Sequence, residues 1–308
     1  MFRRMFLAMS TSGVARWTTE HMPLSRRMVR RFVAGETLDQ AIEVARGLND
    51  QGMLVSLDPL GENVAGHEEA TEATDRILGI VQRIEAEGID STVSIKLTQL
   101  GLDIGDEVCL ANARRILEAA RSAGVTIQID MEGSPYTERT LAVHRTLRGE
   151  FENVGCVIQS YLYRSMEDAH RLAEAGAYVR LCKGAYKEPP EVAFPEKKDV
   201  DRHYLEILEV LLSETSLARG TFPAIATHDE AMIDWVGKHV KQRGIRPDQF
   251  EFQMLYGIRR DLQARLAAEG WRVRVYVPFG PEWYPYFMRR LAERPANAIF
   301  ILKNMVTG

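Results

Sequence analysis

Short apolar or β-branched runs alternate with helical patterns along most of this chain, and this alternation constrains the fold more than any other feature. The runs number eight and lie at residues 53–57, 92–97, 126–131, 155–160, 178–182, 223–227, 250–255 and 273–277. Helical patterns separate them, at residues 68–88, 106–123, 139–147, 165–176, 201–216 and 230–243 among others. Because strands that alternate with helices form parallel sheets, eight such units predict an α/β fold of the (β/α)8 TIM-barrel type.

Two observations favour this barrel over an open, doubly wound sheet. Glycines stand shortly before five of the predicted strands, where the C-cap of a helix is expected, at Gly88, Gly124, Gly176, Gly244 and Gly270. No G-x-G-x-x-G motif follows the first strand, which weakens the alternative of a dinucleotide-binding sheet. No linker divides the 308 residues. We therefore predict one domain over residues 1–308, with a helical arm at 1–50 and the barrel at 51–308.

Charge and cysteine content narrow the class of protein. The net charge of -4 argues against a nucleic-acid partner. Cys109, Cys156 and Cys182 each stand beside apolar residues and form no CxxC pair, so we predict reduced, buried thiols. No apolar stretch is long enough to span a bilayer. Residues 1–31 hold seven arginines against the single acid Glu20. A basic arm packed on the domain and a contact with an anionic membrane surface both fit that pattern.

Polar side chains gather where the predicted strands end, which is where TIM barrels place their chemistry. These residues are Ser94, Lys96, Thr98, Gln99, Gln128, Asp130, Glu132, Gln159, Tyr161, Arg164, Arg180, Lys183, Gly184, Tyr186, Thr227, His228, Asp229, Gln253 and Tyr256, together with the apolar Leu255. So many polar groups at one rim exceed what folding requires, because buried charges are costly unless they are paired. The carboxyl ends of the strands are therefore the candidate site.

Within that rim, Lys96 and Asp130 each lie between apolar residues and are expected to point into the barrel. A compensated structural ion pair and a contact with a cofactor or a reacting amine explain them equally well. His228 has no HxH or HExxH partner, so we predict no metal site.

The last helical pattern, predicted between residues 282 and 294, carries Tyr286, Arg289, Arg290 and Glu293 at i, i+3, i+4 and i+7. These positions share one helix face, and two neighbouring guanidinium groups suit a carboxylate or a phosphate. An ordinary solvated face with ion pairs has the same spacing. The strand just before the helix ends near Tyr276, which brings aromatic hydroxyls to the arginines. Together they indicate a pocket for an amino acid or another carboxylic acid.

Seven segments in fixed order carry a resemblance to a known family. They are SIKLTQLG, IQIDMEGS, VIQSYLYR, VRLCKGAYKEP, ATHDE, FEFQMLYG and VYVPFGPEWYPYFMRRL. As an ordered set over residues 50–305, they resemble the flavin-dependent proline dehydrogenases. Within that family the chain looks like the short bacterial monofunctional enzyme, because these 308 residues show neither an aldehyde dehydrogenase module nor a DNA-binding extension.

The resemblance implies an activity and its partners. L-proline is expected to be oxidised to Δ1-pyrroline-5-carboxylate, the first step of proline catabolism to glutamate, with FAD taking a hydride from proline C5. Electrons would then pass to a membrane quinone, and a separate pyrroline-5-carboxylate dehydrogenase would act downstream. The expected location is the cytoplasm, with a peripheral contact on the inner face of the membrane.

The resemblance also implies roles for residues. Arg289 and Arg290 clamp the proline carboxylate, and Glu293 holds the two arginines. The substrate is further lined by Lys96, Asp130, Tyr186, Leu255, Tyr276 and Tyr286. FAD is held by Gln159, Arg180, Lys183, Gly184, Ala185, Thr227 and His228. Tyr276 would crowd the hydroxyl-bearing carbon of hydroxyproline, so proline is the expected substrate of the two.

Two other functions fit the residues. A Schiff-base lyase or aldolase on the same barrel would use Lys96 or Lys183 as its nucleophile. A non-catalytic module would use the anion pocket to sense a small acid.

Overall fold

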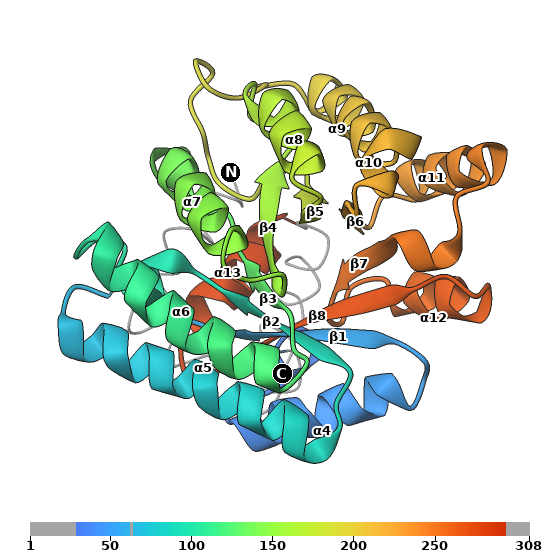
Figure 1. Cartoon of the computed structure of the whole chain (residues 1–308). Coiled ribbons are helices and arrows are strands. Elements are labelled where there is room, and N and C mark those ends of the chain that lie inside the picture. Colours follow the sequence, from blue (N-terminus) through green and yellow to red (C-terminus); the bar gives the residue numbers. More distant parts are fainter. Residues whose placement is uncertain (1–28, 62–63, 294–308) are drawn as a thin grey trace, which may run out of the picture.

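Eight parallel strands close into a barrel in sequence order, with β8 paired to β1 (Figure 1). The computed structural model describes residues 29–61 and 64–293, without the side chains of residues 289–293. The strands are β1 (Leu54–Pro59), β2 (Ser91–Ile95), β3 (Ile127–Ile129), β4 (Val154–Gln159), β5 (Tyr178–Cys182), β6 (Phe222–Ala226), β7 (Glu251–Leu255) and β8 (Val273–Phe279). Each predicted run overlaps one strand, so the predicted (β/α)8 barrel is confirmed.

Helices surround the barrel and cover the outer face of its sheet (Figure 1). They are α4 (Leu38–Asn49), α5 (His67–Glu87), α6 (Asp106–Ser122), α7 (Ser134–Arg148), α8 (Ser165–Glu174), α9 (Lys197–Leu211), α10 (Glu214–Ala218), α11 (Glu230–Arg243), α12 (Arg260–Ala268) and α13 (Trp283–Glu293). Two 3-10 turns, η1 (Leu97–Leu100) and η2 (Pro247–Gln249), precede α6 and β7.

Most predicted helices are confirmed, and two differences have local causes. The single helix expected at 201–216 is two helices, because Ser213 caps α10 by accepting a hydrogen bond from the backbone N–H of Ser216. Helix α12 is not among the helices predicted above, because its nine residues give a weak pattern. The five predicted cap glycines all have positive φ, as a left-handed helix end requires.

The strands alternate between two kinds of environment, both of them buried. Outward positions such as Val93, Leu181 and Phe252 are at most 1% exposed and pack beneath the helices. Many inward positions, for example Ser94 and Arg180, are polar and also buried. TIM barrels usually fill this interior with branched aliphatic side chains. The hydrophobic core of this protein therefore lies between sheet and helices, and the barrel axis is kept for polar groups.

A buried ion pair joins the strands where the barrel closes. Arg274 on β8 donates from Nε to Glu251 Oε1 on β7 at 2.7 Å, and from Nη1 to the carbonyl of Val55 on β1 at 2.7 Å. The hydroxyl of Tyr178 donates to the same Glu251 carboxylate. Burial is the largest influence and by itself would raise the pKa of Glu251, but the charge of Arg274 and the hydrogen bonds from Arg274, Tyr178 and Gln253 together lower it. The pair is therefore charged within the barrel.

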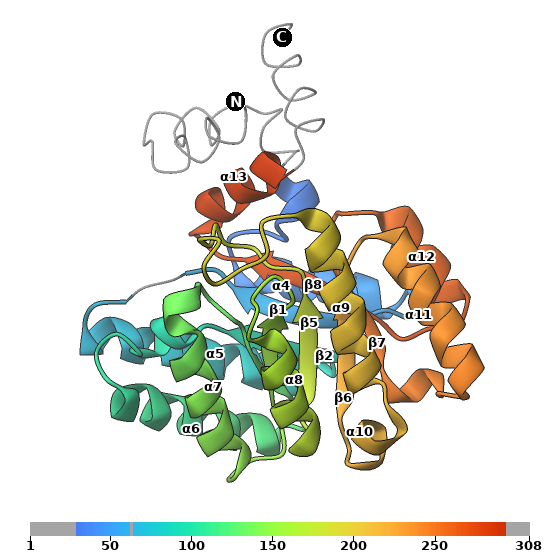
Figure 2. The same cartoon turned by 90° about the horizontal axis from the view of Figure 1, so that it is seen from above.

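The carboxyl end of the barrel is covered by α13, which lies across it in Figure 2. Helical residues 29–32 pack against α13 in a small apolar cluster that includes Phe32, Trp283 and Phe287. Gly257 follows β7 with a φ of 75°, and a Cβ there would stand 1.6 Å from the Arg31 carbonyl oxygen. Only glycine lets the two backbones come this close.

The structure also bears on the predictions for the N-terminal arm, the cysteines and a membrane-spanning helix. Residues 1–28 of the predicted arm, with most of its arginines, lie outside the described residues, and the division into 1–50 and 51–308 stays a prediction. Cys109, Cys156 and Cys182 are free thiols, as predicted, although Cys182 is only partly buried. Within the described ranges, no helix is long and apolar enough to cross a bilayer.

Candidate active site

A cavity of about 390 Å³ opens at the carboxyl ends of the strands, below α13. Fourteen of the residues proposed from the sequence line it, namely Lys96, Asp130, Gln159, Arg180, Lys183, Gly184, Ala185, Tyr186, Thr227, His228, Gln253, Leu255, Tyr276 and Tyr286. They come from strands β2 to β8, the segments that follow them, and α13. The inward alternation of each strand therefore brings residues that are far apart in sequence around one volume.

Asp130, just after β3, is the electrostatic centre of this cavity. Its carboxylate accepts hydrogen bonds from Arg180 Nη1 at 2.6 Å and from the Tyr276 hydroxyl at 2.7 Å. Lys96 Nζ lies 3.4 Å from its second oxygen. Because burial, and next the charge of Asp130, raises the pKa of Tyr276, that hydroxyl keeps its proton and acts as a donor. Three strands thus fix the position of one carboxylate.

Lys96 is held more closely by a residue that the sequence analysis did not single out. Asp58, at the end of β1, accepts a hydrogen bond from Lys96 Nζ at 2.9 Å and is 1% exposed. Burial raises the pKa of Asp58, and the charge of Lys96 opposes that rise. A signal for Asp58 was present, because it directly follows the first predicted strand.

Arg180 connects the cavity to the polar interior of the barrel. Its Nη2 donates to the hydroxyl of Ser94 at 3.0 Å, and its Nε donates to Gln253. The guanidinium also lies 5.1 Å from the centre of the Tyr276 ring, within the range of a cation–π contact. With these contacts and the ion pair to Asp130, Arg180 is held in one orientation at the cavity floor.

Lys183 stands at the rim, where its charge is already balanced by protein groups. Its Nζ donates to Asp201 at 2.6 Å and to Asp229 at 2.8 Å. Hydrogen bonding with Lys183 lowers the pKa of Asp229, so this carboxylate is ionised at neutral pH. Lys183 therefore lies in a salt-bridge cluster that any anionic ligand would have to share.

Two further rim residues have fixed hydrogen-bonding directions. His228 Nε2 accepts a hydrogen bond from the backbone N–H of Leu255 at 2.9 Å, which leaves the proton of the neutral ring on Nδ1. Gln159 accepts from the N–H of Ala185 at 3.2 Å and donates to the carbonyl of Glu132 at 3.1 Å. His228 thereby holds the end of β7, and Gln159 holds the segment that follows β5.

Gly184 is required for close packing. Its φ is 132°, and a Cβ there would come within 2.5 Å of the Tyr161 ring. The Tyr161 ring lies behind the 183–186 segment, so glycine lets that segment pass between the ring and the cavity.

Some rim residues named from the sequence serve the scaffold instead. The buried Glu132 accepts hydrogen bonds from the hydroxyl and the backbone N–H of Thr98. Arg164 pairs with Asp168 and Glu138 along the helices. Neither Glu132 nor Arg164 lines the cavity.

The final helix is placed as predicted, with Tyr286 facing the cavity. The backbones of Arg289, Arg290 and Glu293 belong to α13, one and two turns beyond Tyr286. Their side chains lie outside the described residues.

Comparison with known proteins decides the family. The family model described as proline dehydrogenase matches residues 41–303, which is most of the chain. The chain belongs to the proline dehydrogenase family. It is 46% identical to the proline dehydrogenase of Deinococcus radiodurans over 286 residues, with 91% of each chain covered. It is 43% identical to proline dehydrogenase 1 of Bacillus subtilis subsp. natto over 282 residues, with 92% of each covered.

Solved structures agree on the fold. Proline utilization A (PutA) from Bdellovibrio bacteriovorus, crystallised after inactivation by N-propargylglycine, superposes with a TM-score of 0.84 at 24% identity. The match covers 94% of this chain and 36% of that one. As a proline dehydrogenase, this protein is an oxidoreductase that acts on proline in proline catabolism, and its family consists in general of flavoproteins.

Proposed function

We propose that this proline dehydrogenase uses FAD to oxidise L-proline to Δ1-pyrroline-5-carboxylate and passes the electrons to a membrane quinone. The cluster centred on Asp130 carries the proposal. It joins Lys96, Arg180 and Tyr276 in one cavity at the carboxyl ends of the strands. A small zwitterion such as proline needs this combination of fixed charges and aromatic walls for its orientation.

The residues at the rim fit a flavin nucleotide. Arg180 lies at the floor with its planar guanidinium fixed, and His228 lines the same cavity. Thr227 and the backbone around Gly184 and Ala185 line the same wall. We assign Gln159, Arg180, Lys183, Gly184, Ala185, Thr227 and His228 to FAD binding. When bound, FAD supplies the acceptor for the hydride that leaves proline C5.

The side chains of this protein have three tasks toward the substrate. Arg289 and Arg290 on α13 would clamp the carboxylate of proline, with Glu293 holding both arginines. Tyr186, Leu255, Tyr276 and Tyr286 would enclose the ring and exclude water. The ammonium of Lys96 favours the neutral form of the nearby substrate amine, because like charges disfavour one another. Loss of that proton prepares the nitrogen to form the C=N bond.

The ion pair of Lys96 with Asp58 argues against the lyase alternative. A Schiff-base nucleophile must be a neutral amine, whereas a carboxylate at 2.9 Å stabilises the ammonium form. Lys183 is held by two carboxylates in the same way.

The visible spectrum of the purified protein, recorded before and after anaerobic addition of L-proline, tests the proposal. We expect a flavin spectrum that bleaches with proline. A flavin that stays oxidised would contradict the proposed route of the electrons. A colourless protein that takes up no FAD would contradict the cofactor. Borohydride trapping of a carbonyl substrate on Lys96 or Lys183 would favour the lyase.

The proposed transfer of electrons to a membrane quinone also bears on where the protein acts and which proteins act with it. We propose a cytoplasmic protein that touches the inner face of the membrane, with a separate pyrroline-5-carboxylate dehydrogenase consuming its product and no nucleic-acid partner. Proline-dependent reduction of a short-chain quinone, faster with anionic vesicles than with neutral ones, is the expected result. Equal rates with both vesicle types would contradict the membrane contact.

A further inference from the structure

Residues 183–193, which follow β5 and are called the wall segment below, form one wall of the active-site cavity. The first residues of the wall segment are held by a salt-bridge cluster and by a side chain of β4. At its far end, Ala193 forms an isolated antiparallel bridge with Leu162, in the loop after β4. Between these ends, Tyr186 lines the cavity. The position of this wall therefore depends on what holds the middle of the segment.

Glu188 makes a long-range contact in the middle of the wall segment. Its Oε1 accepts a hydrogen bond from the backbone N–H of Ser134 at 2.8 Å, and its Oε2 accepts one from the Ser134 hydroxyl. The hydroxyl of Tyr161 lies 3.5 Å from Oε1. Ser134 is the first residue of α7 and stands 54 residues before Glu188 in the sequence. One carboxylate thus ties the wall of the cavity to a helix outside the barrel.

The first turn of α7 is suited to this carboxylate. Its N-cap residue is Gly133, which has no side chain to bond the free N–H groups at the start of the helix. The positive end of the helix dipole also favours a negative charge at this place. Glu188 therefore caps α7 from a distant part of the chain.

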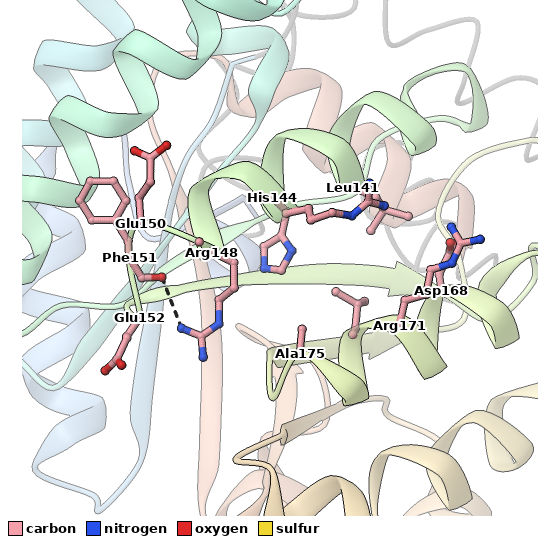
Figure 3. Close-up of a pocket in the computed structure, with 12 residues that line it drawn as sticks. Leu141, His144, Arg148, Glu150, Phe151, Glu152, Asp168, Arg171 and Ala175 are labelled. Atoms are coloured by element: carbon pink, nitrogen blue, oxygen red, sulfur yellow. Dashed lines mark hydrogen bonds between the residues drawn. The ribbon is translucent and has the colours of Figure 1, made fainter.

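Helix α7 is itself fixed to the barrel. Its inner face carries Leu141, His144 and Leu147, all of them buried. Figure 3 shows His144 pointing from α7 toward β4. Because α7 is seated on the sheet in this way, a tie to its first residue fixes the wall segment relative to the strands that carry the rest of the site.

We propose that Glu188 is a positioning residue for proline oxidation. By tying the middle of the wall segment to α7, it holds Tyr186 at the place where this side chain meets the substrate. The inference rests on the proposed assignment of Tyr186 to the proline site. Bound proline would itself hold the wall segment in place, so loss of the tie should weaken binding more than it slows the reaction of bound proline.

Steady-state kinetics of Glu188→Ala, with FAD in excess in every assay, test this role. We expect the KM for proline to rise about threefold or more, because the apparent affinity falls with the fraction of molecules whose wall segment is in place. The kcat should change little. A variant that only folded less well would show the reverse, a lower kcat per mole of protein with an unchanged KM.

The conservative variant Glu188→Gln separates the hydrogen bonds from the size of the side chain. Its amide oxygen can accept from the N–H of Ser134, and its amide nitrogen can donate to the hydroxyl oxygen of the same residue. Glu188→Gln should therefore keep most of the affinity for proline that Glu188→Ala loses.

Hydrogen exchange gives a readout that does not depend on catalysis. In peptides that cover residues 183–188, Glu188→Ala should exchange about tenfold faster, because hydrogen bonds to a charged group are lost. Glu138→Ala is the matched control, since Glu138 also belongs to α7 but pairs with Arg164 at 2.7 Å, away from the wall segment. The control should change neither the KM nor the exchange of residues 183–188.

An unchanged KM or an unchanged exchange rate in Glu188→Ala would overturn the inference. So would a Glu188→Gln variant as impaired as Glu188→Ala, or a control that matches the effect of Glu188→Ala. Failure of the proposed function is distinguishable from all of these outcomes, because proline would then leave the flavin of the unmodified protein oxidised.

Discussion

At the scale of single residues, Tyr276 combines two roles that substitution can separate. Its hydroxyl donates to Asp130, while its ring forms a wall of the cavity. If ring bulk excludes hydroxyproline, Tyr276→Ser should raise the efficiency ratio of hydroxyproline to proline by about tenfold, equivalent to about 1.4 kcal/mol. Tyr276→Phe keeps the ring and should leave that ratio nearly unchanged. Steady-state kinetics with both substrates measure it.

Two outcomes would contradict this account of specificity. One is equal efficiency of the unmodified enzyme on proline and hydroxyproline. The other is a ratio in Tyr276→Phe as high as in Tyr276→Ser, which would assign specificity to the hydrogen bond with Asp130.

His144 makes the stability of the fold depend on pH. Burial, and next the charge of Arg148, lowers its pKa from 6.5 to about 4. Between these values the unfolded chain binds a proton that the folded chain does not, so stability is intact above pH 6.5 and falls as the pH drops toward 4. The expected loss is up to about 3 kcal/mol. Urea unfolding of the unmodified protein and of His144→Gln at several pH values measures it.

The His144→Gln variant lacks the His144 imidazole but keeps every carboxylate of the protein. Its free energy of unfolding should therefore fall less on acidification than that of the unmodified protein. Identical pH profiles for the two proteins would show that His144 is not buried in its neutral form. Direct titration of the His144 ring by NMR checks the same pKa even where the variant is too unstable to study.

At the scale of elements, the packing of α13 on residues 29–33 positions the helix that covers the active-site cavity. Gly257→Ala would place a Cβ 1.6 Å from the Arg31 carbonyl oxygen, so residues 29–33 must move away from α13. The left-handed φ adds strain of roughly 1 kcal/mol. We expect a higher KM for proline and a lower Tm. Gly270→Ala is a suitable control, since its φ is also positive and no atom lies within 4 Å of the added Cβ.

If Gly270→Ala raised the KM for proline as much as Gly257→Ala, this explanation would be contradicted, because backbone strain alone would then account for the effect.

The arginines of α13 allow a test of the proposed clamp. Arg289→Met or Arg290→Met should raise the KM for proline steeply, by about tenfold or more, because a charge-assisted contact to the carboxylate is removed. FAD content, measured from the visible spectrum, should stay unchanged. Loss of FAD in these variants would mean that this face of α13 does not bind the substrate.

At the scale of the whole molecule, the ion pair of Arg274 with Glu251 joins β7, β8 and β1 where the barrel closes. Arg274→Met would leave the Glu251 charge buried without its partner, and we expect a loss of about 3–5 kcal/mol in the free energy of unfolding. The double variant Arg274→Met with Glu251→Leu should recover much of that loss, because neither charge is then left unpaired. Denaturant unfolding measures all three proteins.

A double variant that is less stable than Arg274→Met would contradict this view. It would show that the polar interior tolerates an unpaired carboxylate better than an apolar replacement.

The order of strands and helices, and from it the barrel, could be predicted from the sequence alone. Period-two alternation, helical periodicity and cap glycines are local properties, set by backbone geometry within a few residues. They also indicated which rim residues could meet, since the carboxyl ends of parallel strands share one edge. Eleven of those rim residues do lie around one cavity.

Only the tertiary structure decided which charges pair. Lys96 binds Asp58 more closely than Asp130, and Lys183 is neutralised by Asp201 and Asp229. Periodicity predicts the face on which a side chain lies but not its partner, because a pairing depends on distances between segments that are far apart in sequence. The helices and strands of this protein therefore follow from local sequence, whereas the pairing of its charged side chains follows from the tertiary fold.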